Sequence, residues 1–347
     1  MTETMKIGIL GLVHDHIFLM NELNNFQTIE NVEVTCAADV NEPLRKKVSN
    51  MGVTRTYKDY REMLATEDLD AVAVYAENAL HGVYTEAAAE KGLHVLVEKP
   101  MAANLEIAQK MVAAAQKNHV QMMINFPPFW STALRHAIKM AQDGNIGTIF
   151  ECRFRAAHNG PKEMGCTPFF YNWLYDEKLN GAGAFMDFCT YGAMYSRWVL
   201  GVPEKVTAIG GNYVKDYIAP LEDNAILLMA YKRALGIAEA SWNQIPPGEG
   251  PLYSLILRGN QGTIAASFDK GVKAWMEGGA WTDVKIPPLE TGHQNAPEHF
   301  VSCIRANQPF IDPASAINNL QSQAALEAGL ISLKQDRIVY LTEVLKT

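Results

Sequence analysis

The feature that most constrains the fold is an alternation of short β-rich runs with longer helical patterns over the first 125 residues. This alternation is typical of β-α-β units, whose strands lie parallel in one sheet. The strand candidates are apolar almost throughout, as expected of strands covered by helices on both faces. They are residues 6–10, 32–38, 71–75, 93–97 and 120–124. Residues 1–125 are therefore predicted to form a doubly wound domain around a parallel sheet.

The chain after residue 125 has a different pattern, because Pro127-Pro128 ends the regular alternation. Strand-like runs then follow one another with short turns, which is typical of a largely antiparallel sheet. These runs are residues 148–155, 205–213, 225–231, 234–242, 252–258 and 262–267. Helices are expected at residues 131–142 and 187–200 and from residue 312 onward. Residues 126–347 are predicted to form a second α/β domain.

Composition limits the classes of partner that this chain can have. Its 347 residues are 48% hydrophobic, which is too apolar for intrinsic disorder and long enough for two cores. The net charge is −8 without a basic block, so neither nucleic acid nor a membrane surface is an expected partner. No signal peptide or membrane-spanning run is visible, so a cytoplasmic protein acting on a small molecule is expected. The five scattered cysteines predict reduced thiols.

The turn after the first predicted strand carries part of a dinucleotide-binding fingerprint. The full pattern is Gly-x-Gly-x-x-Gly, in which the glycines allow a tight turn, close approach of pyrophosphate and close helix packing. Gly11 fills the first place, whereas Val13 and His16 occupy the other two. Two outcomes stay open. Either the cofactor is retained and shifts slightly, with His14 or His16 near phosphate, or binding has weakened; we favour retention.

Asp39 stands at the end of the second predicted strand, where a carboxylate binds the ribose hydroxyls of adenosine and repels a 2′-phosphate. NAD is therefore predicted over NADP. Arg45 and Lys46 on the following helix leave NADP possible, since their charges could reach a 2′-phosphate.

The pair His14-x-His16 could also suggest a metal site. Zinc requires a third and usually a fourth ligand. The remaining histidines considered as ligands stand at no recognisable spacing; they are His81, His158, His293 and His299. No metal is predicted from this pattern.

The stronger signal lies downstream, in Asn78-x-x-His81 and in a strand that ends with Glu98-Lys99-Pro100. Ligands bind at the carboxyl ends of strands in open α/β sheets. Lys99 is therefore placed where a nicotinamide ring would lie, and not simply at the surface.

The chain resembles the Gfo/Idh/MocA oxidoreductase family over nearly its whole length. The matching motifs, in order, are Ile7-Gly8-Ile9-Leu10-Gly11, Ala38-Asp39, Asn78-x-x-His81, Glu98-Lys99-Pro100, Gly144-x-Ile146-Gly147 and Gly181-Ala-Gly183-Ala-Phe-Met-Asp187-Phe-Cys-Thr-Tyr191. The resemblance implies an N-terminal Rossmann domain binding NAD or NADP. It also implies a C-terminal domain whose open sheet forms the substrate pocket and usually an oligomer interface, in a homodimer or homotetramer.

Several site residues follow from this resemblance. Lys99 matches the catalytic lysine of the family. Asp187 is kept, while Tyr191 replaces the usual histidine, as in the glucose-fructose oxidoreductase and dihydrodiol dehydrogenase branches. The residues expected at the cofactor are Gly11, Val13, His14, His16, Asp39, Asn78, His81, Glu98 and Lys99.

The spacing of Asp187 and Tyr191 supports this assignment, because residues four apart on a helix lie on one face. A free tyrosine, with a pKa near 10, is a poor base. The ammonium of Lys99 is expected to lower the pKa of Tyr191, and Asp187 to hold the lysine or the substrate hydroxyl. Alternatively, Tyr191 belongs to a buried stripe with Met194.

Aromatic and donor groups suit a polyhydroxylated substrate. The residues predicted to line its pocket are Trp130, Arg153, His158 and Trp173. The predicted function is hydride transfer between nicotinamide and a hydroxyl or carbonyl of a sugar, inositol or related polyol. The alternative is a catalytically silent sugar or dinucleotide sensor on the same fold, which the altered glycine fingerprint would favour.

Overall fold

The computed structural model describes residues 4–245 and 252–345. Its first sheet has six parallel strands in the order β3-β2-β1-β4-β5-β6. The strands are β1 (Met5–Leu10), β2 (Val32–Ala38), β3 (Arg55–Tyr57), β4 (Ala71–Val74), β5 (His94–Glu98) and β6 (Met122–Asn125). The order reverses between β1 and β4, which places a ligand crevice at the carboxyl ends of these strands.

Helices connect these strands, as expected of a doubly wound fold. They are α1 (His16–Leu19), α2 (Glu22–Gln27), α3 (Glu42–Asn50), α4 (Tyr60–Thr66), α5 (His81–Glu90) and α6 (Leu105–Lys117), with the short 3-10 turn η1 (Asn78–Leu80). The amphipathic α6 begins after Asn104, whose side chain accepts a hydrogen bond from the backbone N–H of Ile107.

The second sheet has nine strands in the order β14-β13-β12-β11-β7-β10-β9-β8-β15. Only β7 and β10 pair in parallel, and the remaining pairs are antiparallel. The strands are β7 (Ile149–Ala157), β8 (Lys205–Gly211), β9 (Asn224–Ala230), β10 (Leu235–Ser241), β11 (Tyr253–Gly259), β12 (Gly262–Ser267), β13 (Gly271–Met276), β14 (Thr282–Asp283) and β15 (Val339–Tyr340). The predicted fold class is therefore confirmed.

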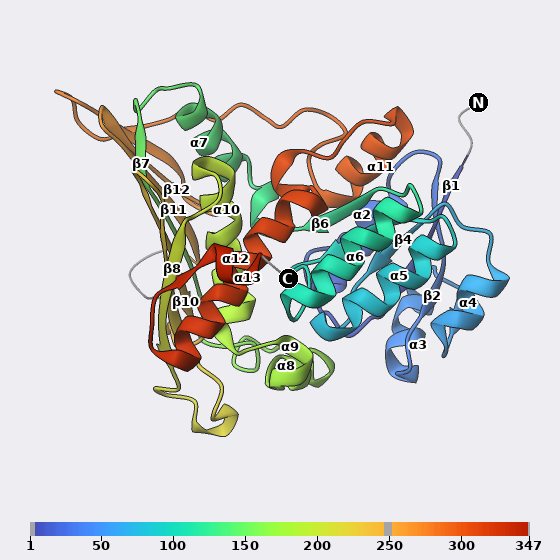
Figure 1. Ribbon diagram of the computed structural model, residues 1–347. Helices are drawn as coiled ribbons and strands as arrows, with labels where there is room; N and C mark the ends of the chain where they lie inside the picture. The colour runs from blue at the N-terminus through green and yellow to red at the C-terminus, as the bar shows by residue number, and fades with distance from the viewer. Residues whose placement is uncertain (1–3, 246–251, 346–347) are drawn as a thin grey trace.

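The helices of the second half gather on the side of this sheet that faces the first lobe, as Figure 1 shows for α7, α10 and α12. The α-helices are α7 (Thr132–Gln142), α8 (Pro168–Leu174), α9 (Glu177–Asn180), α10 (Thr190–Leu200), α11 (Ala296–Ala306), α12 (Ala316–Gln335) and α13 (Leu341–Val344). The shorter turns are η2 (Pro127–Trp130), the π-helical η3 (Phe185–Cys189), η4 (Asp216–Ile218) and η5 (Asp312–Ala314).

The predicted division after residue 125 falls between the two sheets, although the chain returns to the first lobe near its end. The side chain of Arg305, on α11, donates hydrogen bonds to the carbonyl oxygens of Glu30 and Asn31. The carboxylate of Glu327, on α12, accepts one from the backbone of Leu105. Helix α12 thus packs on both lobes, whereas α11 packs on α2 of the first lobe (Figure 1). Domain limits of 1–125 and 126–347 stay a prediction.

The last long helix differs from the prediction. Asp312 and Pro313 form the short turn η5, and α12 begins only at Ala316. The helix is followed by α13, so it does not end the chain's regular structure. Among the helices that the structure describes, none is both long and apolar enough to cross a membrane.

Candidate active site

Two neighbouring residues at the end of β5 face two different clusters of buried polar groups. Glu98 contacts His16 of the turn after β1, whereas Lys99 contacts Asp187 of the second lobe. Successive residues of an extended chain point to opposite sides, so one strand end serves both clusters. Both side chains are buried, Glu98 completely and Lys99 to within 1%.

Lys99 forms a buried ion pair with Asp187. The Nζ atom lies 2.6 Å from Oδ1 of the carboxylate, and the indole N–H of Trp242 donates a 3.0 Å hydrogen bond to Oδ2. Burial by itself raises the pKa of Asp187, but the charge and hydrogen bond of Lys99 outweigh it and hold this pKa below its ordinary value. The carboxylate is therefore charged and fixed in orientation on both oxygens.

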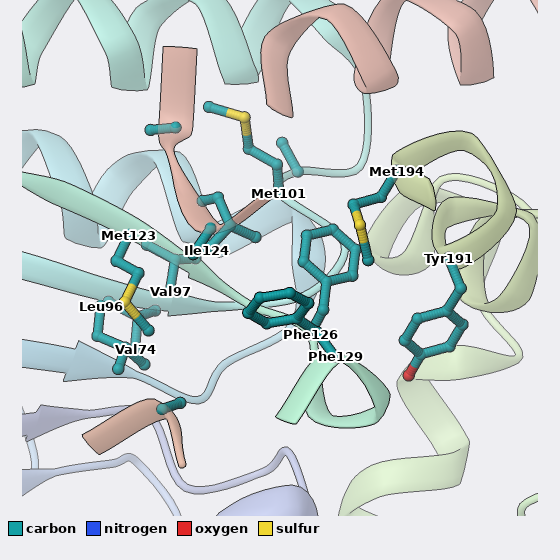
Figure 2. Packing of buried hydrophobic residues seen from close by; sticks show 14 of the residues in the cluster. Val74, Leu96, Val97, Met101, Met123, Ile124, Phe126, Phe129, Tyr191 and Met194 are labelled. Atoms are coloured by element: carbon teal, nitrogen blue, oxygen red, sulfur yellow. The ribbon is translucent and has the colours of Figure 1, made fainter. Parts of the chain in front are cut away.

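Tyr191 joins the same cluster through its ring rather than its hydroxyl. The Nζ atom of Lys99 lies 5.0 Å from the ring centroid, which is a cation–π contact. The ring lies beside Phe126 and Met194, and its hydroxyl points away from them (Figure 2). That hydroxyl is buried, forms no close hydrogen bond among the described residues, and interacts with Tyr253 only at longer range.

The pKa of Tyr191 corrects one expectation. Lys99 was expected to lower it, but burial raises it well above 10, and the charges of Tyr253 and Asp187 add to this effect. The phenol is therefore neutral. It can donate a hydrogen bond to a substrate oxygen, whereas a phenolate base is not available at neutral pH.

Asp187 and Tyr191 both contact Lys99, but the local helix is wider than expected. Asp187 lies in the π-helical turn η3, which runs directly into α10. The carboxylate of Glu222 accepts hydrogen bonds from the backbone N–H groups of Gly183 and Phe185 and so anchors the start of this turn. Such π-helical turns occur often at functional sites, because they re-aim side chains.

The turn after β1 keeps the first feature of a dinucleotide fingerprint. Gly11 has a φ of 77°, and a Cβ atom there would lie 2.7 Å from the Cβ of Ala76, so only glycine fits. The backbone N–H of Leu12 donates a 2.7 Å hydrogen bond to the carboxylate of Asp39. The tight turn and the strand-end acid are thus coupled as the fingerprint requires.

The rest of this turn is covered by the second lobe. Val13, His14 and His16 are 5%, 1% and 8% exposed. The ring of His14 packs on Phe170 of α8, at 4.6 Å between centroids. We therefore expect α8 to shift when a pyrophosphate approaches the backbone of this turn.

The side chain of Asp15 also joins the turn after β1 to the second lobe. The carboxylate of Asp15 accepts hydrogen bonds of 2.6 Å and 2.9 Å from the backbone and hydroxyl of Thr167. Asp15 is 2% exposed and precedes α1, a helix of only four residues. The side chain of Asp15 thus ties the turn after β1 to Thr167, the residue before α8.

The crevice beside the end of β2, where an adenosine would be expected, differs from the covered turn. A surface pocket there is lined by Ala38, Asp39, Val40, Lys58, Asp59, Tyr60, Arg61, Glu62 and Tyr84. The strand-end carboxylate of Asp39 lies in this pocket, which fits the ribose hydroxyls of a dinucleotide. The guanidinium of Arg45 donates a 2.6 Å hydrogen bond to the carbonyl oxygen of Asp39, so a cation stands beside this strand end.

Glu98 forms the centre of the second cluster. Its Oε1 atom lies 3.0 Å from Nδ1 of His16, and its Oε2 atom accepts a 3.0 Å hydrogen bond from Asn125, its neighbour in the strand register. The Asn125 amide also contacts the carboxyl of Glu22 at 3.2 Å and accepts a hydrogen bond from the indole of Trp130. Burial, together with the charge of Glu98, raises the pKa of Glu22 to about 8.

Asn78 and His81 hold backbone rather than pointing into the crevice. The amide of Asn78 donates hydrogen bonds to the carbonyl and side-chain oxygens of Asn180 and thereby joins the two lobes. His81 is completely buried, with Nδ1 3.1 Å from the carbonyl oxygen of Pro100 and Nε2 3.2 Å from that of Ala76. These contacts support the turn after Lys99, and contact of His81 with the cofactor stays a prediction.

The predicted substrate residues divide into two groups. His158 lies near the Lys99 cluster; burial lowers its pKa to about 4, and its Nδ1 accepts a hydrogen bond from Gly160. Trp173 packs on His14 at 5.6 Å between ring centroids and so covers the first turn.

Arg153 and Trp130 lie elsewhere. Arg153 binds Glu239 on the face of β7 opposite to Phe154, whose ring faces Tyr191. In this structure Arg153 is paired with Glu239 and not with the Lys99 cluster, so its contact with substrate stays a prediction. Trp130 is buried behind Asn125.

Three residues at the site were missed by sequence reasoning in their present roles. Trp242 was included as the last residue of a predicted strand, but its indole N–H donates a hydrogen bond to Asp187. Residue 125 was noted only as the end of the first predicted domain, but the Asn125 amide donates a hydrogen bond to Glu98. A polar residue at the end of a strand could have indicated a place at the site. Thr167 carries no pattern of its own, because its contact with Asp15 spans 152 positions.

Comparisons with known proteins agree with this geometry. Residues 5–126 match the model of the oxidoreductase family with an NAD-binding Rossmann fold, and residues 134–265 match the GFO/IDH/MocA C-terminal domain. D-apiose dehydrogenase of Paraburkholderia graminis is 26% identical over 98% of this chain and 91% of its own length. Myo-inositol 2-dehydrogenase of Thermotoga maritima is 25% identical over 68% of each chain.

Solved structures show the same fold. An oxidoreductase from Agrobacterium radiobacter, in complex with NAD+, L-tartaric acid and magnesium, superimposes with a TM-score of 0.82 at 20% identity and 99% coverage of each chain. Levoglucosan dehydrogenase with NADH and levoglucosan gives a TM-score of 0.81 at 19% identity, over 98% of this chain and 100% of its own.

These findings confirm the predicted oxidoreductase class and favour it over the silent sensor. They also confirm the nicotinamide dinucleotide as the cofactor class, because the first lobe is the NAD-binding Rossmann domain of its family. The chain belongs to the Gfo/Idh/MocA family of NAD(P)-dependent oxidoreductases.

Proposed function

We propose that this protein reduces a carbonyl group of a sugar or polyol derivative with NADH, or oxidises the corresponding hydroxyl with NAD+, at Lys99. The observation that carries the proposal is the buried pair of Lys99 and Asp187, only 2.6 Å apart, at the end of a central Rossmann strand. The names of the relatives, which include apiose and inositol dehydrogenases, support a polyhydroxylated substrate.

Lys99 handles the proton in this proposal. A nicotinamide ring, when bound, supplies or accepts the hydride. In the direction of reduction, the ammonium of Lys99 donates its proton to the carbonyl oxygen, which becomes the hydroxyl of the product. In the direction of oxidation, the neutral amine takes that proton back. Asp187 positions the amine and stabilises its charged form, and Trp242 holds the carboxylate still.

Tyr191 and His158 orient the substrate rather than exchange its proton. The neutral Tyr191 hydroxyl is buried beside this cluster and can donate to a second substrate oxygen. The Nδ1 atom of His158 accepts a hydrogen bond from Gly160, so in the neutral ring the proton sits on Nε2. That N–H is a further donor for a hydroxyl-rich ligand.

NAD is proposed as the preferred cofactor. Asp39 would bind the adenosine ribose, Gly11 allows the turn beneath the pyrophosphate, and Lys99 lies at the nicotinamide end. Glu98 supports that end from within the first lobe.

The test is a turnover screen of aldoses, inositols and acyclic polyols with NAD+, and of keto sugars with NADH. We expect steady-state turnover with at least one class of polyhydroxylated compound. Failure of every compound in both directions would overturn the proposal.

A homodimer or homotetramer is part of the proposal. Ile209 of β8 and Ile226 of β9 are paired in register and are 69% and 43% exposed on the sheet face away from the helices. Light scattering with the substitution Ile209→Asp tests this; a monomer in the unmodified protein would contradict it. A cytoplasmic location also stays a prediction, for which fractionation of the source cells is the test.

A further inference from the structure

We propose that His14, His16 and Glu98 bind one divalent transition-metal ion of the Zn2+ type. Each residue offers one ligand atom, and the three atoms lie within 4.8 Å of one another. All three residues are buried. The inference does not rest on the proposed dehydrogenase function, because none of the three is the proton-transferring group.

The geometry is close to that of a coordination sphere. Two ligand atoms that each lie about 2.1 Å from zinc, at a tetrahedral angle, are about 3.4 Å apart. Nδ1 of His16 and Oε1 of Glu98 are 3.0 Å apart. The rings of His14 and His16 lie edge to face with their centroids 4.4 Å apart. The ligand atoms lie up to 4.8 Å apart, so the His14 side chain would have to close the separation by up to about 1.4 Å to complete the set.

The donor set matches the chemistry of a defined metal class. Two imidazoles and one carboxylate are the protein ligands of many catalytic zinc sites and of non-haem iron sites. Three protein ligands leave at least one coordination position, which a water molecule or an oxygen of a bound ligand can fill. Hard cations such as Mg2+ prefer oxygen ligands and fit this set less well.

Neighbouring side chains fix the orientation of the proposed ligands, as they do in known metal sites. The second oxygen of Glu98 accepts a hydrogen bond from Asn125, which fixes the carboxylate plane. The ring of His14 packs on Phe170 and Trp173 of α8. Its one close hydrogen bond among the residues that the structure describes is 3.4 Å long, from the backbone N–H of His16 to Nδ1. A ring that is held by apolar neighbours and weakly hydrogen-bonded is available to a metal ion.

One of the proposed ligands, His16, is also a departure from the glycine fingerprint. His16 occupies the place of the third glycine, which normally lets helix and strand pack closely. An imidazole at this place does not serve that packing. It does bring a nitrogen atom to within 3.0 Å of the buried carboxyl group of Glu98.

The experiment is a metal titration of the full chain after treatment with a chelator and dialysis. Co2+ is the spectroscopic probe and Zn2+ its competitor; elemental analysis counts the ions bound per chain. We expect one Co2+ per chain, visible absorption bands of nitrogen and oxygen ligation, and displacement by Zn2+. The substitutions Glu98→Gln and His14→Gln should each weaken Co2+ binding by about 100-fold or more.

A second cluster provides the matched control. Nδ1 of His293 and Nδ1 of His299 are 2.7 Å apart, and Sγ of Cys303 lies 3.5 Å from Nε2 of His299. The substitution His299→Gln should leave Co2+ binding unchanged, and no intense thiolate-to-cobalt band should appear. Loss of binding in His299→Gln, a thiolate band, or the absence of stoichiometric binding in the unmodified protein would each overturn the proposal.

Folding of the variants is checked by circular dichroism. If Glu98→Gln does not fold, His14→Gln decides, because the ring of His14 gives up only one long hydrogen bond. Retention of full Co2+ affinity in a folded His14→Gln protein contradicts the assignment.

Discussion

The two clusters on either side of the β5 end differ in how they are built. The Lys99 cluster joins the two lobes through Asp187 and consists of residues that match the family's motifs. The Glu98 cluster lies within the first lobe and takes its partner, His16, from the turn that departs from the glycine fingerprint. The comparison teaches that both sides of one strand end depart from the family's usual motifs, but in different ways: Tyr191 stands beside Lys99 in place of a histidine, and His16 stands beside Glu98 in place of a glycine.

The largest expected effect separates the two clusters by function. Lys99→Ala should lower kcat by about 10³-fold, because the reaction loses its proton donor. The affinity for NADH and for Co2+ should stay within a few-fold of the unmodified protein. Lys110→Ala, at an exposed lysine, is the control. An unchanged kcat in Lys99→Ala would remove Lys99 from the mechanism.

A smaller loss is expected when the lysine stays but its partner changes. Asp187→Asn should lower kcat by about 10²-fold, since the amine is no longer held or charge-balanced. Trp242→Phe, which removes one hydrogen bond to the same carboxylate, should cost about 10-fold. If KM for the substrate rises while kcat is unchanged in both variants, Asp187 binds substrate rather than positioning Lys99.

The third test concerns the preference for NAD+ over NADP+. Asp39→Asn should raise KM for NAD+ by about 10-fold and lower that for NADP+, because the charge that binds ribose and repels a 2′-phosphate is lost. Arg45→Ala should have the opposite effect on NADP+. A preference of the unmodified protein for NADP+ would show that the argument from Asp39 is wrong.

The smallest effect concerns stability on the Glu98 side. Burial raises the pKa of Glu22 from 4.5 to about 8, so the folded protein keeps a proton that the unfolded chain releases. The contribution of this group to stability is therefore lost as pH rises from about 5 to 8, by up to about 1.4 kcal/mol per pH unit. Glu22→Gln should remove this slope. Urea unfolding in the presence of a chelator measures it; equal slopes in both proteins would contradict the burial of a protonated carboxyl.

The first lobe was predictable because its signals are local. Five of its strands begin and end within two residues of the predicted limits, since continuous apolar runs leave few alternatives. The short edge strand β3, of three residues, has no such run and was missed. Lys99 and Asp187 were both found from motifs. They contact each other across 88 positions because a strand end and a helix start lie at the same crevice.

The features of the site that could not be predicted depend on which strand face, or which side chain, another part of the chain covers. Arg153 alternates with Phe154 along β7, and the sequence alone does not say which of the two faces the helices. The cover of α8 over His14 and the role of Glu98 as a partner for His16 both arise from long-range contacts. The effect of Lys99 on Tyr191 was misjudged because charge was considered and complete burial was not.

The central claim is that the altered turn still admits a dinucleotide beside Lys99. Titration of the unmodified protein with NADH, followed by energy transfer from tryptophan to the nicotinamide, tests it most directly. We predict saturable binding in the micromolar range, between about 1 μM and 100 μM. The absence of saturation up to about 1 mM NADH would contradict the account.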